Sequence, residues 1–214
     1  MNQLYYFYLS LLLSVALMGW YRYRLLDRAS RVICLLITAT FIAESIAFYT
    51  GMVYRNNMPV YSIFNILQLM LICLYFNYSI DMFFKRHVGV WLAILVLVLG
   101  ICNICFLQPL DQFNSYFLIF ESVLVIFLCI FAYTRLLFTV EDLRLRAYPH
   151  FWFLSIGFAF WSFTLVNWAM YDYFIEQSQG DTHFVNLFIV FVNLLTYSGT
   201  GIVFYLYPYM IKKQ

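Results

Sequence analysis

Seven apolar runs, each about as long as a lipid bilayer is thick, constrain this chain more than any other feature of its sequence. A helix rises about 1.5 Å per residue, so about 20 apolar residues cross a hydrocarbon core of about 30 Å. The alternation of apolar and polar residues typical of membrane β-barrels is not seen. The sequence predicts an all-α, polytopic membrane protein with a seven-helix transmembrane bundle, its helices covering residues 4–21, 32–54, 60–80, 88–108, 115–138, 150–174 and 184–208.

The composition argues against a soluble fold. Hydrophobic residues make up 65% of the chain and charged residues 10%, against about 45–50% and about 25% in typical globular domains. Seven crossings with short connections use nearly all of the 214 residues, so we expect a single transmembrane domain over 1–214. The net charge of +2 is too small to indicate nucleic-acid binding.

The positions of lysine and arginine predict how the chain is oriented. Cytoplasmic ends of transmembrane helices carry an excess of these residues. Counted through seven helices, eleven of the twelve fall on one side of the membrane, and Arg55 falls on the other. We therefore expect the N-terminus outside, the C-terminus in the cytoplasm, and a multi-pass location in the inner (cytoplasmic) membrane.

Aromatic and cysteine residues are interpreted structurally. A ring with a polar group is favoured at a membrane–water interface, and Tyr5, Tyr8 and Tyr61 are expected at the outer one. The five cysteines lie in apolar runs and are interpreted as packing residues. Cys102 and Cys105 form a C-x-x-C on a helix rather than beside a strand, which argues against a redox site.

Polar side chains within the apolar runs are the candidates for function. An ionisable group near mid-membrane costs roughly 2.5–3.5 kcal/mol on insertion scales. The polar residues fall at mid-depth or in the outer halves of their runs, whereas the inner halves contain mostly Leu, Ile, Phe and Val. This asymmetry predicts a cavity open to the outside with the ligand-binding residues Glu44, Asn65, Gln68, Glu121, Asn167 and Asn193.

Glu44, near the middle of the second run, is the most informative of these residues. No lysine or arginine lies at its depth, so the carboxyl group needs a hydrogen-bond partner, water or a proton. We predict a hydrogen bond with Gln68 or Asn193. The alternative is structural, because Asn, Gln and Glu also hold transmembrane helices together, at about 0.6 kcal/mol per contact.

Several enzyme and cofactor classes lack the residues that they require. No lysine lies inside the last run, which excludes a retinal Schiff base. His87, His150 and His183 lie at helix ends or in connections on opposite sides, so we expect no metal site. The motifs G-x-S-x-G and H-E-x-x-H and a phosphate-binding glycine loop are missing. We expect no cofactor, and these observations favour a function other than catalysis.

Four stretches carry a resemblance to a known family: FIAES (41–45), PVYSIFNILQ (59–68), FNSYFLIFES (113–122) and PHFWFLSIG (149–157). On these stretches the chain resembles a family of uncharacterised seven-helix bacterial inner-membrane proteins of about this length. The resemblance implies a seven-helix bundle and supplies no activity. This chain has Gln68 where the family is expected to carry an acidic residue, so a charge-dependent role of that position is in question.

Three hypotheses for the function follow. The leading one is a membrane-embedded sensor or receptor-like protein that binds a small ligand in the outer cavity and signals through a partner on the cytoplasmic side. The second is a transporter or channel for a small solute or ion that uses Glu44 and Glu121 as coupling or selectivity groups. The third is a scaffold subunit or an intramembrane enzyme. The lipid bilayer is the expected surrounding partner, and no feature indicates an oligomeric state.

Overall fold

The regular secondary structure of the chain is helical. The structure, a computed structural model, describes residues 2–139, 145–170 and 183–212, and no strand occurs in these ranges. Seven helices of the described ranges are long and apolar enough to cross a membrane, which confirms the predicted helical class and the number of candidate spans. They are α1 (Asn2–Arg22), α2 (Arg28–Val53), α3 (Met58–Ser79), α5 (Val88–Cys102) with its π-helical continuation η1 (Asn103–Leu107), α6 (Ser115–Thr139), α7 (Pro149–Ala169) and α9 (His183–Ile211).

Apart from shifts of one or two residues, the helices differ from the prediction in four places. α2 begins at Arg28 instead of residue 32, because the Asp27 carboxylate caps the helix and accepts a hydrogen bond from the Ser30 N–H at 3.0 Å. A short helix that the sequence did not predict, α4 (Asp81–Arg86), ends at His87, whose φ of 53° is left-handed. α9 continues through Pro208 to Ile211. α7 ends at Ala169 with Met170 as its C-cap, short of the predicted end at 174, and residues 171–174 lie outside the described ranges.

The contacts group the chain into two compact units, Met1–Phe117 and Leu118–Gln214. α6 begins in the first unit and continues in the second. The single domain expected over 1–214 stays a prediction.

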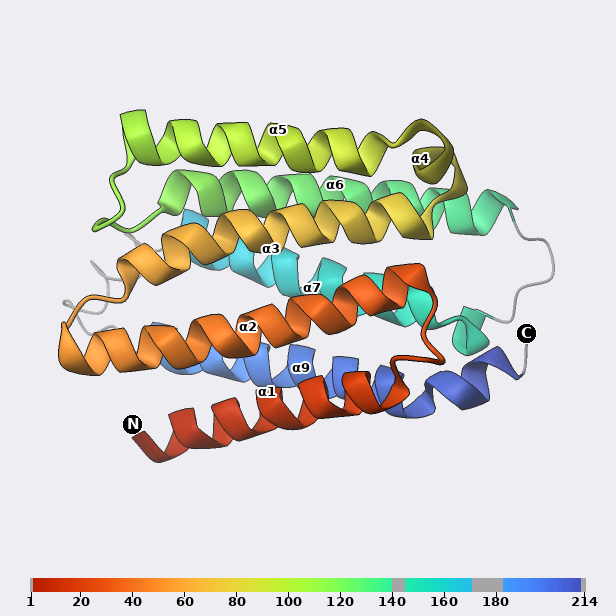
Figure 1. Ribbon diagram of the computed structural model, residues 1–214, viewed down its shortest axis with the longest axis horizontal. Helices are drawn as coiled ribbons and strands as arrows, with labels where there is room; N and C mark the ends of the chain where they lie inside the picture. Colours follow the sequence, from red (N-terminus) through yellow and green to blue (C-terminus); the bar gives the residue numbers. More distant parts are fainter. Residues whose placement is uncertain (1, 140–144, 171–182, 213–214) are drawn as a thin grey trace. The chain divides into compact units, whose positions relative to one another are not determined.

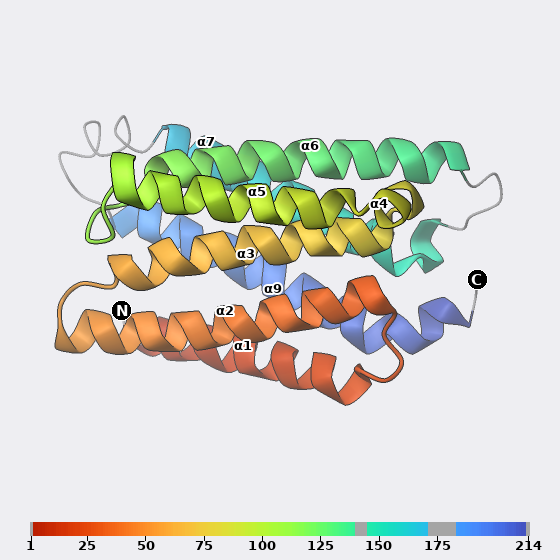
Figure 2. The same cartoon turned by 45° about the horizontal axis from the view of Figure 1, so that its top comes forward.

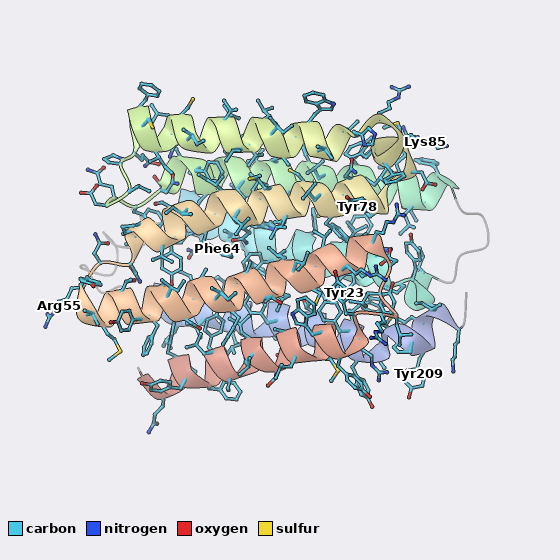
Figure 3. All side chains as sticks on the ribbon, in the orientation of Figure 1. Tyr23, Arg55, Phe64, Tyr78, Lys85 and Tyr209 are labelled. Carbon is cyan, nitrogen blue, oxygen red and sulfur yellow. The ribbon has the colours of Figure 1, made fainter. Side chains whose placement is uncertain are left out.

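The first unit is a row of antiparallel helices. α1 packs on α2, α2 on α3, and α3 on α5, and both views show the four side by side in that order (Figures 1 and 2). Arg55 marks one end of this unit, and Tyr23, Tyr78 and Lys85 mark the other (Figure 3). The end of α5 is joined to the start of α6 by a 2.6 Å hydrogen bond from Nδ2 of Asn103 to Oδ1 of Asn114.

Two glycines allow α5 to approach α3 closely. A Cβ atom at Gly89 would overlap the carbonyl oxygen of Cys73 and the Cβ of Asn77. The N–H of Gly89 also donates a hydrogen bond to Oδ1 of Asn77 at 3.1 Å. A Cβ at Gly100 would lie 2.6 Å from two carbons of Ile66. Small residues of this kind are the usual means by which transmembrane helices pack at short range.

The second unit is held together by aromatic and hydroxyl contacts. The rings of Phe153 on α7 and Phe204 on α9 lie 5.6 Å apart at 61°. The α6–α7 contact includes a 2.7 Å hydrogen bond from the Tyr133 hydroxyl to Oγ of Ser155. These pairs fix the register of α7 against both neighbours.

Many large apolar side chains face away from the protein on the long helices. Leu17, Ile63 and Phe127 are 60%, 60% and 67% exposed. In water such a surface would be unfavourable, whereas lipid tails solvate it. Together with the seven long apolar helices of the described ranges, it is the pattern of a multi-pass membrane protein.

The cysteines divide into two groups. Cys34, Cys73 and Cys129 are buried, as expected of packing residues. Cys102 and Cys105 are exposed at the end of α5 and in η1, so their interpretation as packing residues was wrong. The position of an apolar run in the sequence does not say which of its faces turns inward.

We predict that Gly89→Ala destabilises the first unit by more than about 2 kcal/mol, because the added methyl group meets rigid backbone and Asn77. The matched control is Gly51→Ala on α2, where the nearest atom to an added Cβ is 3.8 Å away. It should be neutral or gain up to about 1 kcal/mol from reduced chain entropy. Unfolding by SDS in bicelles measures both, and equal effects would contradict the close α3–α5 contact.

Candidate functional site

Glu44 lies on α2, nearer to its Val53 end than to its Arg28 end. It is about 13 Å from the Val53 end of a helix about 39 Å long, at about 1.5 Å per residue. Ala43 and Ala47 beside it are buried, and such small side chains let neighbouring helices come close. The first two turns of α1 and the first turn of α3 carry the residues that reach its carboxylate.

Three tyrosine hydroxyls surround the Glu44 carboxylate. Tyr5 donates to Oε2 at 2.8 Å, and its oxygen also lies 3.1 Å from the Glu44 backbone carbonyl oxygen. Tyr61 of α3 donates to Oε2 at 3.0 Å, and Tyr8 of α1 donates to Oε1 at 3.1 Å. One carboxylate on α2 therefore links α1, α2 and α3. We call Glu44, Tyr5, Tyr8 and Tyr61 the tyrosine–carboxylate cluster.

The cluster leaves part of the carboxylate available. An ionised carboxylate has about four acceptor positions, two on each oxygen. Oε2 of Glu44 accepts two of the three hydroxyls and Oε1 accepts one. One acceptor position on Oε1 remains for a further donor. No lysine or arginine of the described ranges forms an ion pair with Glu44, so the described residues supply no counter-charge there.

The surroundings of the carboxylate are aromatic. Tyr5 stacks on Phe48, with ring centroids 4.8 Å apart at 17°, and Tyr8 lies 5.7 Å from Tyr5. The rings of Tyr6 and Phe48 are also in contact, edge to face, with centroids 5.5 Å apart. Tyr8 is buried, while Tyr5, Glu44 and Tyr61 are partly exposed. Aromatic rings around an anion form a site that suits an organic cation, since both the charge and the ring faces attract it.

The other predicted site residues of the first unit lie on α3. Asn65 is buried and Gln68 is half-buried. Neither side chain makes a hydrogen bond within the described ranges, so the predicted bond from Gln68 to Glu44 was wrong. Tyr61 begins the same helical stripe as these two amides, and it is the member of that stripe that contacts the carboxylate.

The second unit contains the remaining predicted residues. Glu121 on α6 is fully buried, and neither carboxyl oxygen has a hydrogen-bond partner in the described ranges. Asn167 on α7 is buried, and its Nδ2 also has no hydrogen-bond partner in the described ranges. The Tyr133–Ser155 hydrogen bond sets the register of α6 against α7. Glu121 precedes Tyr133 on α6, and Asn167 follows Ser155 on α7 by the same number of residues. Both side chains therefore belong to one level of the α6–α7 pair.

Asn193 is half-buried on α9. Its predicted hydrogen bond to Glu44 stays a prediction, as does the convergence of all six residues on one cavity. No group of three His, Cys, Asp or Glu side chains that could hold a metal ion occurs among the described residues.

The sequence did not identify the three tyrosines as partners of Glu44. They were assigned to the outer aromatic belt, and their ring chemistry fits that place as well. The available signal was spacing: Tyr5 and Tyr8 lie one turn apart on α1, at the end of the unit where α2 places Glu44. A pair of hydroxyl-bearing rings at i and i+3 presents two donors to one neighbour.

We predict that Tyr61→Phe lowers stability by about 1–3 kcal/mol, because hydrogen bonds to a charged group are worth about 1.5–3 kcal/mol. Tyr49→Phe on α2 is the control, since Tyr49 is 61% exposed and should change stability by less than about 0.5 kcal/mol. Glu44→Ala should cost more than Glu44→Gln, because glutamine keeps an acceptor for the hydroxyls. Bicelle unfolding tests all four variants, and a Tyr61→Phe protein as stable as Tyr49→Phe would remove the cluster as a structural link.

Comparison with known proteins yields no match to a family model, a curated protein or a solved structure. The resemblance to a seven-helix family stays a prediction.

Proposed function

We propose that this chain is a receptor-like protein of the cytoplasmic membrane that binds a small organic cation at the tyrosine–carboxylate cluster. The observation that carries the proposal is the Glu44 carboxylate, held by three hydroxyls, with no cationic partner in the described ranges and with one acceptor position left on Oε1. A small ammonium ion would lie beside that position, attracted by the negative charge, and against the rings of Tyr5 and Tyr8. Each ring contributes about 0.5–2 kcal/mol to holding a cation.

The orientation in this proposal follows from the basic residues. Arg55 lies at the same end of the first unit as the cluster, and Lys85 lies at the opposite end (Figure 3). The other lysine and arginine residues of the unit belong to the end of α1, the connection after it, the start of α2, and α4, which are all at that opposite end. By the positive-inside rule the opposite end faces the cytoplasm. The N-terminus and the cluster are then external, and a ligand reaches Glu44 from outside the cell.

Signalling follows from the position of Glu44 among three helices. A ligand that binds the Glu44 carboxylate weakens the hydrogen bonds that this carboxylate accepts from Tyr5, Tyr8 and Tyr61. The contacts among α1, α2 and α3 change as a result. All three helices cross the unit to its opposite end, where we propose that a partner on the cytoplasmic side reads the change. The ligand can shift the equilibrium only by its differential affinity for the two arrangements.

A transporter is the second candidate, and Glu121 favours it. A fully buried carboxyl group without a hydrogen-bond partner in the described ranges is costly in a transmembrane helix, and such groups often mark ion or proton pathways. In this reading Glu121 carries or couples the transported ion, and Glu44 selects it.

We predict that choline and tetramethylammonium raise the thermal stability of the protein in nanodiscs, whereas 3,3-dimethyl-1-butanol, the uncharged shape analogue of choline, does not. At a ligand concentration of about 100 times Kd, the stabilisation is about 2.7 kcal/mol. Glu44→Gln should abolish the response and Tyr49→Phe should keep it. An equal response to the neutral analogue, or a full response in Glu44→Gln, would contradict the proposal.

Flux measurements separate the receptor from the transporter. For a receptor, we predict that proteoliposomes containing the protein take up labelled choline no faster than empty liposomes, although the cation binds. Uptake that is lost in both Glu44→Gln and Glu121→Gln would establish the transporter. Uptake that is lost only in Glu44→Gln would exclude Glu121 from the pathway.

A further inference from the structure

The end of the first unit opposite the cluster is strongly basic. Six of the seven lysine and arginine residues of Met1–Phe117 belong to the end of α1, the connection after it, the start of α2, and α4. Lys85 and Tyr23 lie at this end and Arg55 at the other (Figure 3). The segments meet in space, because the Arg28 guanidinium of α2 lies 5.9 Å from the Phe84 ring centroid of α4. We call this surface the basic end: Arg22, Arg24, Arg28, Arg31, Lys85 and Arg86.

Three guanidinium groups of the basic end are positioned by aromatic rings. Arg31 lies 5.2 Å from the Tyr23 ring centroid, and Arg22 lies 5.1 Å from that of Tyr21. Tyr23 in turn stacks on Trp20 at 4.8 Å and 19°. Cation–π contacts of this kind hold a guanidinium plane in place without occupying its N–H donors.

Most of the N–H donors of these arginines have no acceptor among the described residues. A guanidinium group has five N–H donors. Nε of Arg31 donates to the Leu26 carbonyl oxygen at 2.9 Å, and Nε of Arg22 is buried without an acceptor in the described ranges. Across those ranges, no residue of the basic end forms an ion pair with a carboxylate. Asp27, the nearest acid in sequence to Arg28, caps α2 by accepting from the Ser30 N–H.

The chemistry and position of the basic end fit a phosphate at the membrane surface. The planar guanidinium group of arginine can donate two parallel hydrogen bonds to two phosphate oxygens. Several arginines together favour binding of a phosphate monoanion or dianion. The site lies where the candidate membrane-spanning helices α1 and α2 end, which is where lipid headgroups are expected. Trp20 and Tyr21 beside it are 46% and 78% exposed, as rings at a lipid–water interface are.

We propose that the basic end binds the phosphate of an anionic phospholipid, with Arg28 and Arg31 as its main ligands. Arg22 and Lys85 add charge at the edge of the site. The proposal does not depend on what binds at Glu44, because the two sites lie at opposite ends of the same helices. A bound headgroup would join α1, α2 and α4 where the protein itself provides no ion pair in the described ranges.

Native mass spectrometry of the delipidated full chain, titrated with phosphatidylglycerol or phosphatidylcholine, tests the proposal. We predict at least tenfold tighter binding of phosphatidylglycerol. Arg28→Gln/Arg31→Gln should weaken it roughly thirtyfold, which corresponds to about 1 kcal/mol for each arginine near the surface. The matched control is Arg55→Gln, an exposed arginine at the other end of the same unit, which should leave binding unchanged.

The outcomes are distinguishable. Arg28→Lys/Arg31→Lys keeps the charge and loses the planar guanidinium groups, so this variant should bind phosphatidylglycerol with intermediate affinity. It replaces the glutamine variant if the glutamine variant does not fold. Equal binding of the two lipids would overturn the proposal, as would an equal loss in Arg55→Gln. Displacement of phosphatidylglycerol by millimolar inorganic phosphate would show a site for a free anion and would also overturn it.

Discussion

A bilayer offers no water to a polar group, so each one in a membrane-spanning helix needs a partner within the protein. Small hydroxyls meet this requirement locally. Thr40 and Thr200, for example, donate to carbonyl oxygens one turn back on their own helices, each at 2.8 Å. A carboxylate cannot do so, because it accepts hydrogen bonds and the carbonyl groups of its helix donate none. The two carboxylates of the described spans therefore have to be explained by their neighbours.

Glu44 and Glu121 differ in this respect. Glu44 is bonded by three phenol hydroxyls from two neighbouring helices, and those bonds tie α1, α2 and α3 together. Glu121 is fully buried, and its oxygens have no partner in the described ranges. A satisfied carboxylate at a partly exposed position suits ligand binding, because a ligand can compete for it. An unsatisfied carboxyl in a buried position suits a transported proton or ion. The receptor and transporter proposals thus rest on different residues.

The first unit is chemically asymmetric along its helices. One end has a carboxylate among aromatic rings and a single arginine, and the other has six basic side chains. α1, α2 and α3 extend from one end to the other. A cation at the first end and a lipid phosphate at the second would act on the same three helices. In the proposed receptor, the lipid contact would hold the cytoplasmic side of these helices while the ligand alters the external side.

The sequence by itself predicted the number of candidate spans and their helical class, because the bilayer sets the length of an apolar run and that length is a local property. It also predicted that Glu44 needs a partner. It did not identify Tyr5, Tyr8 and Tyr61, since the partner depends on how α1, α2 and α3 are rotated and shifted against one another. The same reason explains why Cys102 turned out to be exposed and why Gln68 is not bonded to Glu44. Rotation and register arise from packing between helices, including the close approach at Gly89, and only the tertiary structure decides them.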